Sequence, residues 1–117
     1  MRSKSEVIIA NLLHANQVDY TYEQQLEIDG VPTGKFPDFT IEDADAGVTY
    51  CWEHLGMLGD AGYKRRWEDK ERWYNSQGIF RWDVPEKSRR RLITTSDGAR
   101  GDIDSAGIER LIKTVFR

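Results

Sequence analysis

Three carboxylates occupy positions where a negative charge is costly. Asp38 lies in the apolar segment 36–41, Glu53 lies near the end of the aromatic segment 48–54, and Glu6 lies at the margin of an apolar helical stripe. A carboxylate in such surroundings needs a positive partner or a metal ion. If the two segments are neighbouring strands of one hairpin, Asp38 and Glu53 can converge on one ion. Hard oxygen ligands of this kind suit Mg²⁺ or Mn²⁺.

Each of these acids, taken alone, also has an ordinary structural interpretation. Asp38 can be a turn or strand-edge residue, and Glu53 can pair with a nearby arginine. Both interpretations stay open when the acids are considered one at a time. A further functional group that faces the same site is needed to favour a catalytic or metal-binding role over these structural ones.

The segment 60–77 supplies such a group in Lys70. Tyr63, Trp67, Lys70 and Tyr74 are spaced by four, three and four residues, which places them within about 60° of one another on a helix. The lysine therefore lies within an aromatic stripe. It can simply extend over the rings towards water, or it can be held inward to meet the carboxylates and a phosphate.

The elements that would position these residues follow from periodicity and capping. Residues 60–77 form a helix that Asp60 caps and Gly78 ends, and Ser3 with Glu6 suggests a capping box at the first helix. Residues 79–84 are expected to be extended, and 86–91 to be a charged loop or helical turn. The other expected elements are a helix over 4–16, strands over 19–28, 36–41, 48–54 and 92–95, and a helix from Asp104 or Ser105 to about 116.

The expected order is α-β-β-β-α-β-α, which predicts an α/β or α+β domain with a small mixed sheet flanked by helices. The length of 117 residues predicts a single domain over 1–117.

No apolar run approaches the ~18 residues of a membrane span, and the N-terminus lacks a signal-peptide cleavage site. One cysteine, Cys51, excludes an internal disulfide and a multi-cysteine zinc site. These features predict a cytoplasmic protein with no membrane association.

The charge is unevenly distributed along the chain. The net charge of −3 argues against nucleic acid, but residues 1–63 carry three basic and eleven acidic groups, and residues 64–91 carry ten basic and five acidic ones. This division predicts either a two-faced surface with one basic side or ordinary solvated charge on helices and loops.

The ordered motifs resemble the PD-(D/E)XK nucleases of the restriction-endonuclease-like fold. Pro37-Asp38 is followed, after a hairpin, by Glu53-His54-Leu55, and Lys70-Glu-Arg-Trp-Tyr74 resembles a helical motif of the exonuclease-like branch. Leu55 stands where the usual lysine lies, and several members of the superfamily carry this lysine on the helix, as Lys70 would. Wider strings over residues 3–79 resemble nuclease domains that often accompany helicases.

The resemblance implies a metal-dependent DNA endonuclease or nickase, with DNA repair or defence against phages and mobile elements as its setting. Asp38 and Glu53 would bind Mg²⁺, for which Mn²⁺ would substitute, together with the backbone carbonyl of His54. Glu6 would reach the ion directly or through water. Lys70 would position the attacking water or stabilise charge on the phosphate. The choice between one ion and two stays open, and the His54 side chain is expected to be a satisfied structural histidine.

The expected DNA contacts are basic or polar groups near a helix N-terminus, on the second helix and before the last strand. They are Lys4, Ser5, Lys64, Arg65, Arg66, Tyr74, Arg89, Arg90 and Arg91. Equally, Ser5 can be a plain helix cap and Lys4 a solvated surface charge.

Two other functions stay open. The missing lysine at position 55 allows a catalytically inactive nuclease-like module that binds DNA or a protein, and a small α/β interaction domain without a nucleic-acid role is the third interpretation. DNA is the expected partner of the active form. Cutting both strands would favour a homodimer, and the chain can also be a domain of a larger helicase-containing protein.

Overall fold

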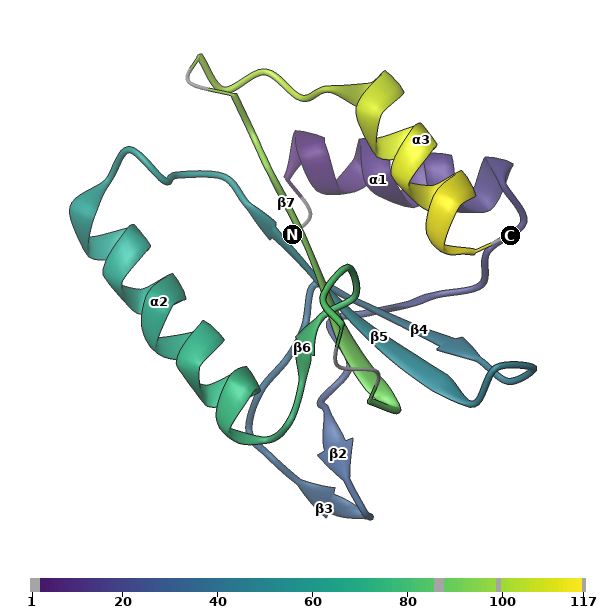
Figure 1. The fold of residues 1–117 in the computed structure, drawn as a ribbon. Helices are drawn as coiled ribbons and strands as arrows, with labels where there is room; N and C mark the ends of the chain where they lie inside the picture. The colour runs from purple at the N-terminus through teal and green to yellow at the C-terminus, as the bar shows by residue number, and fades with distance from the viewer. Residues whose placement is uncertain (1–2, 86–87, 99, 117) are drawn as a thin grey trace.

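The computed structural model describes residues 3–85, 88–98 and 100–116. It shows a mixed α/β fold with three helices, a five-stranded mixed sheet and a separate two-stranded hairpin (Figure 1). The elements in chain order are α1 (Lys4–Ala15), β1 (Thr21–Tyr22), β2 (Glu27–Ile28), β3 (Val31–Pro32), β4 (Phe39–Asp43), β5 (Val48–Leu55), α2 (Ala61–Ser76), β6 (Phe80–Arg81), β7 (Arg90–Ser96) and α3 (Ser105–Val115).

The five-stranded sheet has the order β1-β4-β5-β7-β6. β4 pairs antiparallel with both β1 and β5, which confirms the predicted hairpin, whereas β7 pairs parallel with both β5 and β6. A parallel pair needs a long crossover connection, and α2 lies within the connection from β5 to β7. The long central strand β5 therefore joins the antiparallel and the parallel halves of the sheet.

The sheet lies between two helical layers. α1 and α3 lie side by side over one face, and α2 lies on the opposite side (Figure 1). Successive side chains of β5 face opposite helical layers. Tyr50 and Trp52 belong to the core under α1 and α3, and Cys51 packs with Tyr74 of α2. Glu53 follows the same alternation and therefore faces α2.

The predicted helices are confirmed with small shifts at their ends. α1 begins with the predicted capping box, in which the Ser3 hydroxyl accepts the Glu6 N–H and the Glu6 carboxylate accepts the Ser3 N–H. Asp60 caps α2 and Asp104 caps α3. Among the helices of the described residues, none combines the length and the apolar character needed to cross a bilayer.

The predicted strand over 19–28 is wrong as a continuous element. It is divided into β1, which joins the main sheet, and β2, which pairs with β3 in a separate hairpin. Glu23 between them has φ 53°, a left-handed conformation that interrupts an extended strand. The Asp29-Gly30 turn, with φ 52° and 81°, has the two positive values of a tight hairpin turn.

Three further boundaries differ from the prediction. β4 begins at Phe39 and not at residue 36, and only Phe80–Arg81 of the predicted extended segment 79–84 forms a strand. β7 begins at Arg90, so Arg90 and Arg91 lie in a strand where a loop or helical turn was predicted. Residues 86–87 of that segment lie outside the described residues. The observed order is therefore α-β-β-β-β-β-α-β-β-α.

Candidate active site

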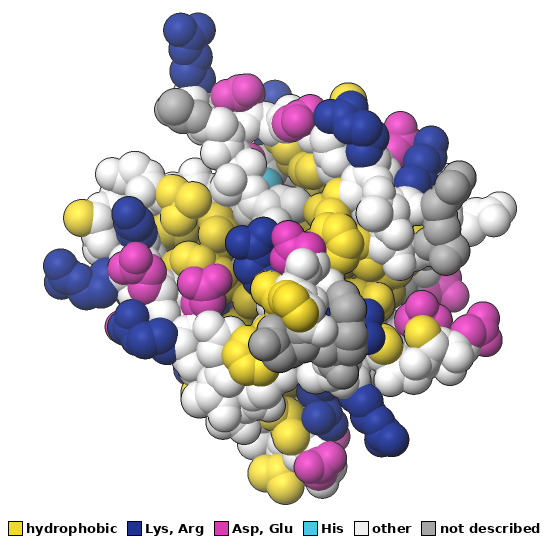
Figure 2. Space-filling view, in the orientation of Figure 1, with side chains coloured by type: hydrophobic (Ala, Val, Ile, Leu, Met, Phe, Trp, Pro, Cys, Tyr) yellow, Lys and Arg dark blue, Asp and Glu magenta, His cyan; other side chains and the backbone are white. Residues whose placement is uncertain are grey.

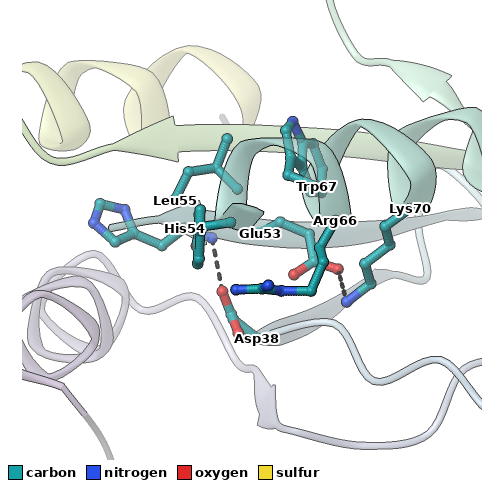
Figure 3. Close-up of a pocket in the computed structure, with 8 residues that line it drawn as sticks. Asp38, Glu53, His54, Leu55, Arg66, Trp67 and Lys70 are labelled. Atoms are coloured by element: carbon teal, nitrogen blue, oxygen red, sulfur yellow. Dashed lines mark hydrogen bonds and ion pairs between the residues drawn. The ribbon is translucent and has the colours of Figure 1, made fainter. Parts of the chain in front are cut away.

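Asp38, Glu53 and Lys70 line one open pocket of about 190 Å³ between the sheet and α2. Asp38 lies just before β4, Glu53 on β5 and Lys70 on α2, so three elements contribute (Figure 3). The other lining residues are His54, Leu55, Tyr63, Arg66 and Trp67. The structure thus brings together Asp38 and Glu53 of the hairpin and the helix residue Lys70 in one pocket, as predicted.

The hairpin register explains why the two carboxylates meet. Phe39 pairs with Trp52, so the residues just outside this pair, Asp38 and Glu53, lie at the same end of the hairpin. The His54 N–H donates a 2.7 Å hydrogen bond to Oδ2 of Asp38, which holds that carboxylate against the end of β5.

Lys70 extends inward from α2 to meet Glu53. Its Nζ lies 2.5 Å from Oε2 of Glu53 and 3.5 Å from the Phe36 carbonyl oxygen. The Lys70 side chain is 27% exposed and that of Glu53 only 6%. Of the two placements considered for this lysine, the inward one is correct, because the buried carboxylate needs a positive partner.

Tyr74 is a correction to the predicted DNA contacts. The residue is 0% exposed, and its hydroxyl donates a 2.6 Å hydrogen bond to Oε2 of Glu53. Burial, and secondarily the negative charge of Glu53, raise the pKa of the Tyr74 phenol well above its usual range, so the group stays protonated as a donor. Tyr74 therefore orients a site carboxylate, and a fully buried ring cannot contact DNA.

Asp38 lies in an environment that disfavours its negative charge. The pKa of its carboxyl is raised to about 7, chiefly by burial and then by the charges of Glu53 and Glu6, against the lowering effects of the His54 N–H and Lys70. Two close carboxylates with one lysine leave negative charge incompletely balanced. A cation placed between them would remove that imbalance.

The donor set fits a hard divalent ion with few protein ligands. The contacts above engage Oδ2 of Asp38 and Oε2 of Glu53, and within the described residues no hydrogen bond or ion pair engages the second oxygen of either. Mg²⁺ is commonly held by one or two carboxylates, with waters and substrate phosphates completing its shell. No group of three or more His, Cys, Asp or Glu side chains converges as a metal cluster in the described parts of the chain.

Glu6 does not line the pocket. Its carboxylate accepts the Ser3 N–H in the capping box and lies 3.3 Å from the Tyr22 hydroxyl, which donates to it. Its charge still contributes to raising the pKa of Asp38. The structure therefore places Glu6 close enough to influence the site electrostatically, with its carboxylate engaged by α1 and β1.

The His54 side chain is a satisfied structural histidine, as predicted. It points away from Asp38 and Glu53 (Figure 3), and its Nδ1 and Nε2 lie 2.8 Å from Thr95 Oγ1 and Asp97 Oδ1 respectively. The Ser5 hydroxyl donates a 2.6 Å hydrogen bond to the same Asp97 oxygen. Trp52 Nε1 donates to Thr95 at 2.9 Å, so the network crosses from the core to α1.

This network corrects the prediction for Ser5 and adds two residues. Ser5 is buried and bonded to Asp97, so it is a packing contact between α1 and the end of β7 and not a surface phosphate ligand. Thr95 and Asp97 were not singled out in the sequence. Asp97 directly follows β7, and a polar residue at the end of a strand parallel to β5 is the signal that could have identified it.

The predicted basic contacts fall into separate places. Arg66 lines the pocket, Lys64 and Arg65 are exposed on α2, and Lys4 is exposed at the start of α1. Arg89 is exposed just before β7 and Arg91 donates to the Ser88 carbonyl. In the parallel pairing of β5 with β7, Arg90 lies opposite Thr49 and Thr94 lies opposite Glu53. Arg90 is therefore four residues, or roughly 13 Å of strand, away from the level of Glu53.

Comparison with known proteins finds a partial similarity to an uncharacterized protein. No family model matches the sequence, and no solved structure matches it. The chain is 38% identical over 80 residues to the uncharacterized protein MJ1519 of Methanocaldococcus jannaschii. The match covers 68% of this chain and 6% of the relative, so the chain spans a small fraction of the length of that protein.

Proposed function

We propose that this chain is a metal-dependent DNA endonuclease or nickase domain of the PD-(D/E)XK type with a restriction-endonuclease-like fold. The observation that carries the proposal is the convergence of Asp38, Glu53 and Lys70 in one open pocket. The β4–β5 hairpin, the helix after it and the parallel strand β7 agree with that fold type.

Asp38 and Glu53 would hold Mg²⁺ or Mn²⁺, with the backbone carbonyl of His54 as a further ligand. The bound ion would supply a Lewis acid for the scissile phosphate and lower the pKa of a bound water. The incompletely balanced negative charge around Asp38 supports this assignment.

The chain's own residues would orient the substrate and balance its charge. Lys70 is held at the site by Glu53 and the Phe36 carbonyl, so its ammonium group is oriented before substrate arrives. From there it can donate to a phosphate oxygen or to the attacking water. Arg66 on the same pocket wall offers a second cation for the phosphate, and Tyr74 holds the Glu53 carboxylate in place.

A catalytically inactive, nuclease-like binding module is the second candidate. Leu55 lies where the usual lysine is expected, and the Lys70 ammonium already neutralises Glu53 at 2.5 Å. In such a site the lysine ammonium can neutralise the carboxylate in place of a metal ion. This candidate predicts DNA or protein binding without cleavage.

Cleavage of supercoiled plasmid tests the two candidates. With Mg²⁺ or Mn²⁺ the wild type should convert the plasmid to nicked or linear form, and EDTA should stop the reaction. Asp38→Asn, Glu53→Gln and Lys70→Ala should each lower the rate by about 100-fold or more. Asp45→Asn is the matched control, because Asp45 is an exposed carboxylate in the turn between β4 and β5.

The outcomes separate the candidates clearly. No cleavage with intact DNA binding favours the inactive module, and no DNA binding even at low salt, where phosphate contacts are strongest, favours an interaction domain without a nucleic-acid role. Equal loss of activity in Asp45→Asn and Asp38→Asn would contradict the assigned site.

DNA is the proposed partner, and a homodimer or a larger helicase-containing protein is the proposed setting. The match to a short part of a far longer archaeal protein supports a domain that also occurs within larger polypeptides. Static light scattering would report whether the isolated chain forms a dimer.

A further inference from the structure

A second groove lies beside the pocket and shares two of its residues. It has a volume of about 450 Å³ and is lined by Gly34, Lys35, Phe36, Arg66, Asp69 and Lys70. Arg66 and Lys70 also line the pocket that holds Asp38 and Glu53. A chain that passes through the groove would therefore reach the proposed site of hydrolysis.

Phe36 gives this groove an aromatic surface. The residue is 50% exposed, although it directly precedes the fully buried Pro37 and the site residue Asp38. Its carbonyl oxygen lies 3.5 Å from Lys70 Nζ, and a residue before proline has restricted backbone angles. The backbone of Phe36 is thus constrained at the site while much of its ring remains in water.

The loop that carries Phe36 is ordered by hydrogen bonds to the segment before β2. The Leu26 N–H donates to the Lys35 carbonyl at 2.8 Å, and the Thr33 N–H and hydroxyl both donate to the Leu26 carbonyl. The Gly34 N–H donates to the Gln25 side chain. An aromatic ring on a loop held in this way loses little entropy when it binds a ligand.

The charge around the ring is suited to phosphate. Asp69 is hydrogen-bonded to Arg72, and Lys70 is paired with Glu53, so these charges are compensated. Within the described residues Lys35 and Arg66 make no ion pair, and the Lys35 ammonium lies 5.4 Å from the centroid of the Trp73 ring. The groove therefore presents two available cations beside one exposed aromatic ring.

A ring of this kind beside cations is the arrangement that binds single-stranded nucleic acid. Within a duplex the faces of paired bases are covered by their neighbours, so stacking on Phe36 favours an unpaired base. We propose that the groove holds a DNA strand whose bases are unpaired next to the scissile phosphate. Phe36 stacks on one base while Lys35 and Arg66 contact phosphates. This inference rests on the proposed function and names its substrate class: single-stranded DNA, or duplex DNA with an unpaired segment.

Oligonucleotide binding without cleavage tests the groove. Fluorescence anisotropy in EDTA measures the affinity for a labelled oligo-deoxythymidine and for a blunt duplex of the same length. Phe36→Ala should weaken single-strand binding by about 10-fold, the loss expected for one stacked base, and leave duplex binding within about twofold. Val31→Ala is the matched control, because Val31 is 62% exposed on β3, outside the groove.

Two further variants separate stacking from general apolar contact. Phe36→Trp should retain single-strand affinity, whereas Phe36→Leu, which keeps apolar area without an aromatic face, should lose it. Equal affinity for Phe36→Leu and the wild type would overturn the proposal, as would an unchanged affinity of Phe36→Ala.

Cleavage assays keep this test distinct from that of the proposed function. Phe36-dependent single-strand binding without any metal-dependent cleavage would support the groove and contradict the nuclease. Metal-dependent cleavage that is equally fast on blunt duplex and single strand, and that Phe36→Ala does not change, would support the nuclease and overturn the groove.

Discussion

Glu53 is the residue around which the candidate site is organised. One of its oxygens, Oε2, lies within hydrogen-bonding distance of both Lys70 Nζ and the Tyr74 hydroxyl. These two groups reach it from successive turns of α2, and β5 supplies the carboxylate itself. The second site carboxylate, Asp38, has a weaker set of donors. Burial is the main cause of the raised pKa of Asp38, and the His54 N–H and Lys70 offset it only in part.

The raised pKa of Asp38 predicts a pH-dependent stability. Its carboxyl titrates at about 7 in the folded chain against 3.8 ordinarily, so the folded state binds this proton more tightly than the unfolded state. The contribution of Asp38 to the free energy of unfolding is greatest below pH 3.8 and declines as the pH rises to about 7. Because the carboxyl is partly solvated, we expect the decline to be about 1–2 kcal/mol. Asp38→Asn, which cannot ionise, should become more stable than the wild type over this range in EDTA.

Urea denaturation at a series of pH values measures this difference. Asp45→Asn is the control, since the exposed Asp45 carboxylate has no comparable surroundings. Added Mg²⁺ should stabilise the wild type and not Asp38→Asn, because a cation that binds only the folded state adds to its stability. A wild-type minus variant difference that does not change with pH would refute the electrostatic account of Asp38.

At the scale of elements, the alternation of β5 separates two polar systems. Glu53 faces α2 and the pocket, and the next side chain, His54, faces the opposite layer and bonds to Asp97. The Asp97 carboxylate also accepts from Ser5 of α1. The end of β7 thereby connects α1 to the strand that carries the site, in a region where buried polar groups must be paired.

A double-mutant cycle tests the connection between α1 and β7. Ser5→Ala and Asp97→Ala should each lower the free energy of unfolding by about 1–3 kcal/mol, because each leaves a partly buried polar partner unsatisfied. Their combined effect should fall short of the sum by at least about 0.5 kcal/mol, as expected for groups in direct contact. Chemical denaturation of the single and double variants supplies these values.

The control cycle combines Ser5→Ala with Asp45→Asn, which shares no contact with Ser5. These two effects should add. Full additivity of Ser5→Ala and Asp97→Ala would show that the hydrogen bond does not couple the two elements.

At the scale of the whole molecule, the described basic residues are distributed over several elements. On the face drawn in Figure 2, Lys and Arg side chains alternate with Asp and Glu over α2. Arg66 lies at the pocket, whereas Arg90 lies at the opposite end of the sheet and donates to Asp29 at 3.5 Å. Among the described residues of 64–91, basic side chains therefore lie both at the pocket, where Arg66 is found, and at the start of β7, where Arg90 is found.

This division predicts unequal effects of two arginine substitutions on DNA binding. Arg66→Ala should weaken binding several-fold and reduce the salt dependence by about one phosphate contact. Arg90→Ala should leave both unchanged, because Arg90 lines a different pocket beside the β2–β3 hairpin. Anisotropy of labelled DNA across a salt series measures both quantities, and equal losses for the two variants would place the DNA path along the whole sheet.

The local elements were largely predictable. Strong periodicity and caps located α1, α2 and α3, and the aromatic stripe of α2 left Lys70 two placements, of which the structure shows the inward one. The hairpin of β4 and β5 correctly placed Asp38 beside Glu53. Strands of two residues, such as β1 and β2, carry too few positions for an alternating pattern, and the left-handed Glu23 between them left no signal in the residue types.

Sequence alone determined which side chains share a face, because helix and strand periods act within a single element. The expected hairpin and the resemblance to PD-(D/E)XK nucleases then predicted that Asp38, Glu53 and Lys70 form one group. Only the tertiary structure decided that Tyr74 is buried against Glu53 and that Ser5 is bonded to Asp97. It also placed Phe36, exposed, beside Arg66 in the second groove. These placements depend on how α2 and β7 pack around β5, and packing between distant segments is set by the fold as a whole and not by local spacing.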